Sequence, residues 1–160
     1  MLNQGEYAVY GMNGVCRVSG TEERDGKLFY LLEPVSDPAL KIFIPVTNAA
    51  VRSPIGKDEA FRLLESVDAM TDVWVNDNRD RRRIFSDIMS KYELSDMLRL
   101  AKSIYLKKCE RRAMGKSMYS YEDNQLRTAE KAVCGELAFA LDITSEKAAE
   151  LLEERFLHSA

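Results

Sequence analysis

The chain has 160 residues and a formal net charge of −3, which is enough for one domain or two small ones. It contains no apolar run near the roughly 20 residues that span a bilayer. The start of the chain lacks a basic segment followed by an apolar one, so we expect a cytoplasmic protein without a membrane anchor or secretory signal. The three cysteines, Cys16, Cys109 and Cys134, are far apart in the sequence, which predicts reduced thiols and neither disulfides nor a zinc site.

The first fifty residues are typical of short strands and tight turns. β-Branched and aromatic residues fill 7–10, 15–18, 28–33 and 41–46, with Gly, Asn and Asp between them. Asn13-Gly14 supplies the positive φ angles of a tight hairpin, and a second turn falls at 24–27. Pro45 lacks a backbone donor and indicates a sheet edge or strand end. Strands without an intervening helix predict a small antiparallel barrel of Tudor-like or SH3-like size over residues 1–55.

From about residue 57 the apolar residues follow helical spacing, which predicts an all-α domain over 56–160. The first helix begins near Asp58. A second helix carries an apolar stripe from Ile84 to Tyr92, and Arg81 lies on that stripe one turn earlier. Ser95 is the expected cap of a third helix, which ends at Gly115. Ser120 and Asp123 resemble a capping box for a fourth, and Thr144 or Ser145 starts the fifth. The expected fold class is α+β, a β domain followed by a helical one.

Charge is distributed unevenly along the helical part. Residues 74–116 hold 12 basic and 6 acidic residues, whereas residues 117–160 hold 4 basic and 9 acidic ones. Cations near the end of a helix complement its dipole, which is the alternative explanation for those in 107–112. Basic residues at a helix start oppose the dipole, so 79–83 indicate an external anion. The residues that we predict to contact phosphates are Arg79, Arg81, Arg82, Arg83, Lys102, Lys107, Lys108, Arg111 and Arg112.

The sequence has no pattern that indicates catalysis. It contains no glycine-rich phosphate loop, no metal-ligand spacing and no Ser/His or Cys/His pair, and its only histidine is His158. Acid pairs such as Glu122-Asp123 have polar neighbours and are interpreted as solvated surface. We therefore expect a binding protein with no enzymatic activity, no cofactor and no metal.

Several segments resemble CarD/CdnL-type bacterial transcription regulators, whose N-terminal module has a relative in the transcription-repair coupling factor. The resemblance is most specific in the run from Gly5 to Tyr10, the Asn13-Gly14 turn, the strand at 30–32 and the run from Lys41 to Ala49. It is looser in the helices, at 81–93 and 129–141. It implies a Tudor-like domain that pairs an edge strand with the β subunit of RNA polymerase. It also implies a helical domain that contacts promoter DNA at the upstream edge of the melted region and stabilises the open complex.

The resemblance also implies particular residues. Arg24 falls where the family places a basic polymerase contact, and Lys41, Ile42, Phe43 and Ile44 fall on the pairing edge. Phe43 occupies a position that is basic in some relatives, so either it makes an apolar contact there or it packs inside the barrel. Proline at Ile42 is expected to remove a backbone donor of the edge.

The tryptophan that some family members wedge against the DNA fork is replaced here by Asn78. Trp74 lies four residues earlier and is either a core anchor or a displaced wedge.

The expected protein is thus a monomeric regulator that bridges the polymerase β subunit and promoter DNA. The alternative is an adaptor that keeps the polymerase contact and uses its helices to bind another protein.

Overall fold

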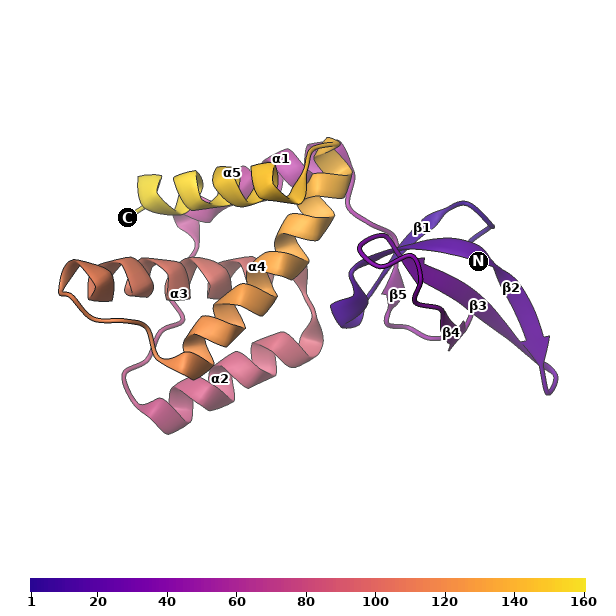
Figure 1. The fold of residues 1–160 in the computed structure, drawn as a ribbon, viewed down its shortest axis with the longest axis horizontal. Helices are drawn as coiled ribbons and strands as arrows, with labels where there is room; N and C mark the ends of the chain where they lie inside the picture. The colour runs from indigo at the N-terminus through magenta and orange to yellow at the C-terminus, as the bar shows by residue number, and fades with distance from the viewer. The chain divides into compact units, whose positions relative to one another are not determined.

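A computed structural model describes all 160 residues, which form two compact units, Met1–Ile55 and Gly56–Ala160. The first unit is an antiparallel sheet of five strands (Figure 1). Its strands are β1 (Tyr7–Tyr10), β2 (Val15–Arg24), β3 (Lys27–Pro34), β4 (Ile42–Pro45) and β5 (Val51–Arg52), in the order β4-β3-β2-β1-β5. The β2–β3 turn is as predicted, with Asp25 (φ 52°) and Gly26 (φ 76°) at its centre. The tight Asn13-Gly14 hairpin is wrong: β1 and β2 are joined by a 3-10 turn, η1 (Gly11–Asn13), in which Gly11 and Gly14 have positive φ and Asn13 does not.

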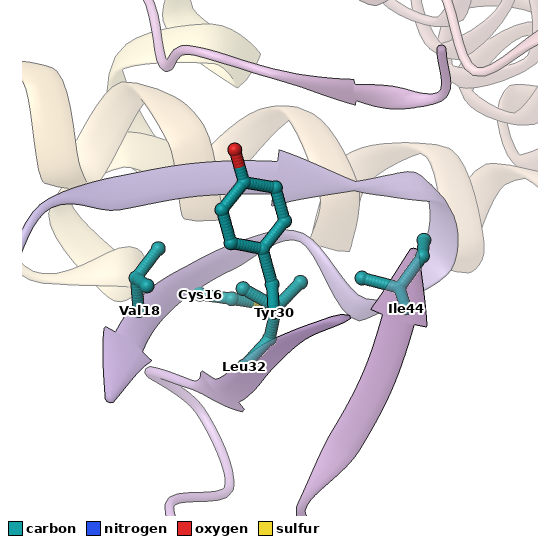
Figure 2. Close-up of a cluster of buried hydrophobic side chains, with 5 residues drawn as sticks. All are labelled: Cys16, Val18, Tyr30, Leu32 and Ile44. Atoms are coloured by element: carbon teal, nitrogen blue, oxygen red, sulfur yellow. The ribbon is translucent and has the colours of Figure 1, made fainter. Parts of the chain in front are cut away.

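The core of the sheet lies on one of its faces. Cys16, Val18, Tyr30, Leu32 and Ile44 form a buried cluster (Figure 2), and the Tyr30 hydroxyl accepts a hydrogen bond of 2.8 Å from the Leu2 backbone N–H. Alternate residues on β3 and β4 contribute to the cluster, as expected for strands with one buried face.

The sheet is not closed into the expected barrel. β4 and β5 are its two edges, and β5 is only two residues long and pairs with β1 alone. Closure needs a continuous ladder between the first and last strands, and this short strand does not provide one. The edge position of β4 agrees with the interpretation of Pro45.

The second unit consists of five helices. They are α1 (Lys57–Ser66), α2 (Asn78–Lys91), α3 (Leu94–Ala113), α4 (Ser120–Leu141) and α5 (Ser145–His158), with a 3-10 turn, η2 (Val67–Ala69), after α1. α3 and α4 form the central pair, α2 packs on α3, and α5 packs on α4 and α3. The largest wholly buried side chains here include Phe85, Leu98, Ile104, Leu137 and Phe156. No helix is long and apolar enough to cross a membrane.

Helix ends show where capping rules hold and where they fail. The Thr144 hydroxyl accepts from the Lys147 N–H and caps α5 as expected. Gly115 (φ 73°) follows the end of α3 as predicted. Two predicted caps are wrong. α3 begins at Leu94 with Glu93 as its N-cap, so Ser95 does not cap it. α4 begins at Ser120 with Tyr119 as its N-cap and no side-chain cap. Asp123 instead binds Lys108 and Arg127.

Candidate functional site

The outer edge of β4 presents backbone groups at alternate residues. The Val46 N–H donates to the Leu28 carbonyl at 3.1 Å, and Ile44 and Ile42 lie opposite Tyr30 and Leu32. Hydrogen-bonded pairs alternate in an antiparallel ladder, so Ile42 and Ile44 bond inward to β3. Phe43 therefore directs its N–H and carbonyl away from the sheet. The expectation for Ile42 is corrected, because its N–H belongs to the sheet.

Pro45 lies two residues after Phe43 on β4, so its backbone groups also face outward. Its missing N–H would point outward, where the sheet needs no donor. Proline is thus tolerated on this edge without loss of a ladder bond.

Two of the predicted polymerase contacts are brought together above this edge. The Arg24 guanidinium carbon lies 4.0 Å from the centre of the Phe43 ring, a cation–π contact. Glu22 fixes the guanidinium through hydrogen bonds of 3.2 and 3.4 Å. Phe43 is 39% exposed, so it does not pack inside the sheet core. Lys41 binds Glu33, and this hydrogen bond holds the pKa of the Glu33 carboxyl below its ordinary value.

Arg81 is buried, which corrects its predicted role as a phosphate contact. Only 3% of it is exposed, and its Nε donates to Glu122 at 2.8 Å. Its other nitrogens donate to the carbonyls of Val75 and Asn76 and to the Asn78 side chain. A guanidinium with all of these partners ties the segment before α2 to α4 and has no free face for DNA.

The interpretation of Glu122 as solvated surface is also wrong, since it is 1% exposed and forms this ion pair. The sequence carried a signal for both partners. Arg81 lies one turn before Phe85 on the buried stripe of α2, and Glu122 lies one turn before the buried Leu126 on α4. A charge on an apolar stripe indicates a buried partner.

Lys102 is corrected in the same way. It is 7% exposed, and its ammonium donates to the carbonyls of Val67 at 2.6 Å and Met70 at 3.2 Å. Lys102 therefore satisfies carbonyl groups at η2 and just after it, and does not face solvent.

Trp74 is half-buried beside this network. Its ring meets Phe85 edge to face with centroids 6.0 Å apart, and the Arg81 guanidinium covers it at 4.3 Å. The segment around it is fixed by hydrogen bonds from Val73 N–H to the Ser103 hydroxyl and from Trp74 N–H to Asp72. These contacts favour the anchor over the wedge.

Two of the remaining predicted cations lie near tyrosines that the sequence interpretation missed. The Arg111 guanidinium lies 4.2 Å from the centre of the Tyr119 ring, and that of Arg82 lies 4.8 Å from Tyr121. The Lys107 ammonium lies 5.6 Å from the Trp74 ring. Figure 1 shows the start of α2, the end of α3 and the start of α4 at one end of the helical unit. The basic–aromatic face is defined by Arg79, Arg82, Arg83, Lys107, Arg111, Arg112, Tyr119 and Tyr121.

Lys108 is largely neutralised within the fold. Its ammonium binds Asp123 at 2.6 Å, and this hydrogen bond lowers the pKa of the Asp123 carboxyl. Arg83 pairs loosely with Asp80 at 3.7 Å, and Arg79, Arg82 and Arg112 are exposed. Asp77 caps α2 by accepting from the Asp80 N–H at 2.9 Å. Two acids at this helix start offset part of the unfavourable placement of the arginines.

No group of three or more His, Cys, Asp or Glu side chains is placed to hold a metal ion. The three cysteines are unpaired. Burial raises the pKa of the Cys16 thiol to about 11 and that of Cys134 to about 12. These two thiols therefore remain protonated at neutral pH and have little thiolate character.

Comparison with known families identifies the first unit. Residues 2–56 match the family model for the CarD-like/TRCF RID domain. The sheet with its exposed edge is thus an RNA polymerase-interacting domain, the module of a transcription-related protein. Over these residues the chain is similar to the CarD-like family, in agreement with the resemblance noted in its strands and turns. The match ends where the helical unit begins. No curated protein sequence matches the chain.

Proposed function

We propose that this protein regulates transcription by bridging RNA polymerase and promoter DNA. In this proposal the β4 edge pairs with the polymerase β subunit, and the basic–aromatic face binds DNA at the upstream edge of the melted region. The protein acts as a monomer, by binding alone, and stabilises the open complex without catalysing a reaction.

The polymerase half rests on the backbone of β4. Phe43 offers one outward N–H and one outward carbonyl, which is what a partner strand needs to extend the sheet. Arg24, held over Phe43 by Glu22, adds a fixed charge beside that strand. An acidic or polar rim on the partner strand would complement this arrangement.

The observation that carries the DNA half is the gathering of exposed and half-buried cations and tyrosines from three helices at one end of the unit. Cations bind phosphates and release counterions, which makes the affinity depend steeply on salt. Tyrosine rings and guanidinium planes add surfaces on which unpaired bases stack. A face that offers both suits the junction between duplex and melted DNA. Trp74 contributes by holding Arg81 and Lys107 in place.

The test is the lifetime of the open complex formed by the cognate polymerase, with and without the protein. Wild-type protein should lengthen this lifetime. The variant Arg79→Glu/Arg82→Glu/Arg83→Glu should bind polymerase normally and lose the effect. On forked duplex DNA its salt slope should fall by roughly 0.9 for each phosphate that the variant no longer neutralises.

A matched control is Lys57→Glu/Lys131→Glu/Lys147→Glu, which changes the charge by the same amount at exposed positions outside the face. It should leave the salt slope unchanged. If both triple variants weaken DNA binding equally, only the net charge matters. If neither does so and the lifetime effect persists, the helices contribute through a protein contact, as in the adaptor alternative.

A further inference from the structure

A groove runs between the C-terminal halves of α1 and α5. It encloses about 520 Å³ and is lined by Phe61, Leu64, Glu65, Leu151, Glu154, Arg155 and His158. Phe61 is 48% exposed although it lies on the apolar side of α1, and Leu64 and Leu151 are only half-buried. An exposed phenyl ring beside two half-buried leucines forms an apolar floor that this chain does not cover.

The rim of the groove is acidic. Glu65 and Glu154 are exposed and form no ion pair within the chain. Segments 57–69 and 145–158 each carry two basic and four acidic residues. The C-terminal end of a helix also bears a partial negative charge, and the last turn of α1 holds no basic residue.

One lining cation is already engaged. The Arg155 Nε donates to the Leu64 carbonyl at 3.1 Å and joins α5 to α1. Its positive charge remains, but the two glutamates, Glu65 and Glu154, outnumber it and leave the rim negative. Nucleic acid is repelled by such a surface, whereas a cationic apolar partner is attracted.

We propose that this groove binds a basic amphipathic helix of a partner protein. Leucine-like side chains of that helix enter between Phe61, Leu64 and Leu151, and its lysines or arginines meet Glu65 and Glu154. A third helix laid over two packed ones is a common recognition mode, with anchors spaced three and four residues apart. This goes beyond the proposed function, because it adds a second partner at a separate site.

The groove and the basic–aromatic face lie on different parts of the helical unit. α1 and α5 lie along one side, α2 along the other, and α3 and α4 between them (Figure 1). Binding of the helix should therefore leave DNA binding intact. The net charge of each region also prevents either ligand from occupying the other site.

The probe is a dye-labelled synthetic helix with leucine on one face and lysine on the other, titrated against the full chain and followed by anisotropy. Two comparison peptides carry the same leucines with glutamate in place of lysine, or the same composition in scrambled order. We expect saturable binding of the first peptide alone, at micromolar concentration and weakened by salt.

Variants locate the site. Phe61→Ala should weaken binding at least fivefold, and Glu65→Gln/Glu154→Gln about tenfold with a shallower salt dependence. The matched controls are Leu157→Ala, which is 53% exposed and outside the groove, and Glu59→Gln/Glu146→Gln on the same two helices. These controls should bind like wild type, and unchanged thermal melting would show that all variants are folded.

The proposal is overturned if the lysine peptide does not bind, if the scrambled or glutamate peptide binds equally well, or if groove and control variants behave alike. A failure of DNA binding itself would count against the proposed function only.

Discussion

The two units of this protein present their binding groups in different ways. The sheet offers backbone atoms along β4, positioned by the strand ladder, with Phe43 and Arg24 above them. The helical unit offers only side chains, because its backbone groups are used within helices. A backbone site depends on register and tolerates changes of side chain, whereas a side-chain site depends on each supporting residue.

The largest effect should come from removing one partner of the buried ion pair in the helical unit. Glu122→Gln leaves the Arg81 charge buried without its counter-charge, and we expect a loss of about 3–5 kcal/mol in the free energy of unfolding. Urea denaturation measures this loss, with the exposed Glu146→Gln as a control that should stay within about 0.5 kcal/mol. Because the two residues act as a pair, Arg81→Met/Glu122→Leu should cost less than the two single changes added together. Additive costs would contradict the coupling.

Trp74→Ala should have the next largest effect. The ring is half-buried against Phe85 and under Arg81, so we expect a loss of about 2–3 kcal/mol, below the range for a wholly buried tryptophan. Trp74→Phe keeps an aromatic ring there and should lose about half as much. Trp74 is the only tryptophan, so its fluorescence reports directly on this site. If forked DNA lowers the emission intensity and shifts the wavelength of the maximum, Trp74 contacts DNA.

In the sheet, removing a backbone N–H should weaken binding more than removing a side chain does. Phe43→Pro removes the one outward N–H of the edge and should weaken polymerase binding at least tenfold, while the sheet stays folded as it does with Pro45. Phe43→Ala keeps that N–H and should weaken binding only two- to threefold. Binding to immobilised polymerase, with melting curves as the folding control, separates the two. Equal losses for both variants would place the contact in the ring and not in the backbone.

The smallest effect concerns the ion pair between Lys108 and Asp123. The folded pKa of Asp123 lies below its unfolded value, mainly through the Lys108 hydrogen bond. The pair therefore contributes its full stability above the unfolded pKa, and this contribution is lost as the pH falls through the folded pKa. Asp123→Asn should lower stability by less than about 1 kcal/mol at neutral pH, since the pair is partly exposed. Below the folded pKa, melting curves of variant and wild type should coincide. If the variant still melts at a lower temperature than wild type at that pH, the substitution has removed packing contacts and not only a charge.

Sequence patterns predicted the elements better than their surfaces. The apolar stripe around Phe85 and Ile88 and the β2–β3 turn follow from local rules. The burial of Arg81 does not, because it depends on Glu122, which lies 41 residues away. A run of arginines looks equally basic whether its members face solvent or a partner. Of the nine predicted phosphate contacts, Arg81 and Lys102 are excluded by burial, and Tyr119 and Tyr121 join the surface through contacts that no local pattern encodes.

The strand edge shows the same limit. Alternation indicated which face of β4 is apolar, but which N–H groups point outward depends on pairing with β3. That pairing is visible only in the bond from Val46 to Leu28. Barrel closure likewise depends on whether the last strand is long enough to reach β4. With two residues, β5 is too short.

The bond from Arg155 to the Leu64 carbonyl spans 91 residues of sequence, and this has a consequence for synthesis. Contacts between distant residues form only after the intervening chain is available. α1 therefore emerges from the ribosome long before α5, the helix that closes over it. The sheet is complete by residue 55, so it can fold while the remaining helices are still being made. Nascent chains arrested before α5 should accordingly carry a folded, protease-resistant sheet followed by a protease-sensitive helical segment.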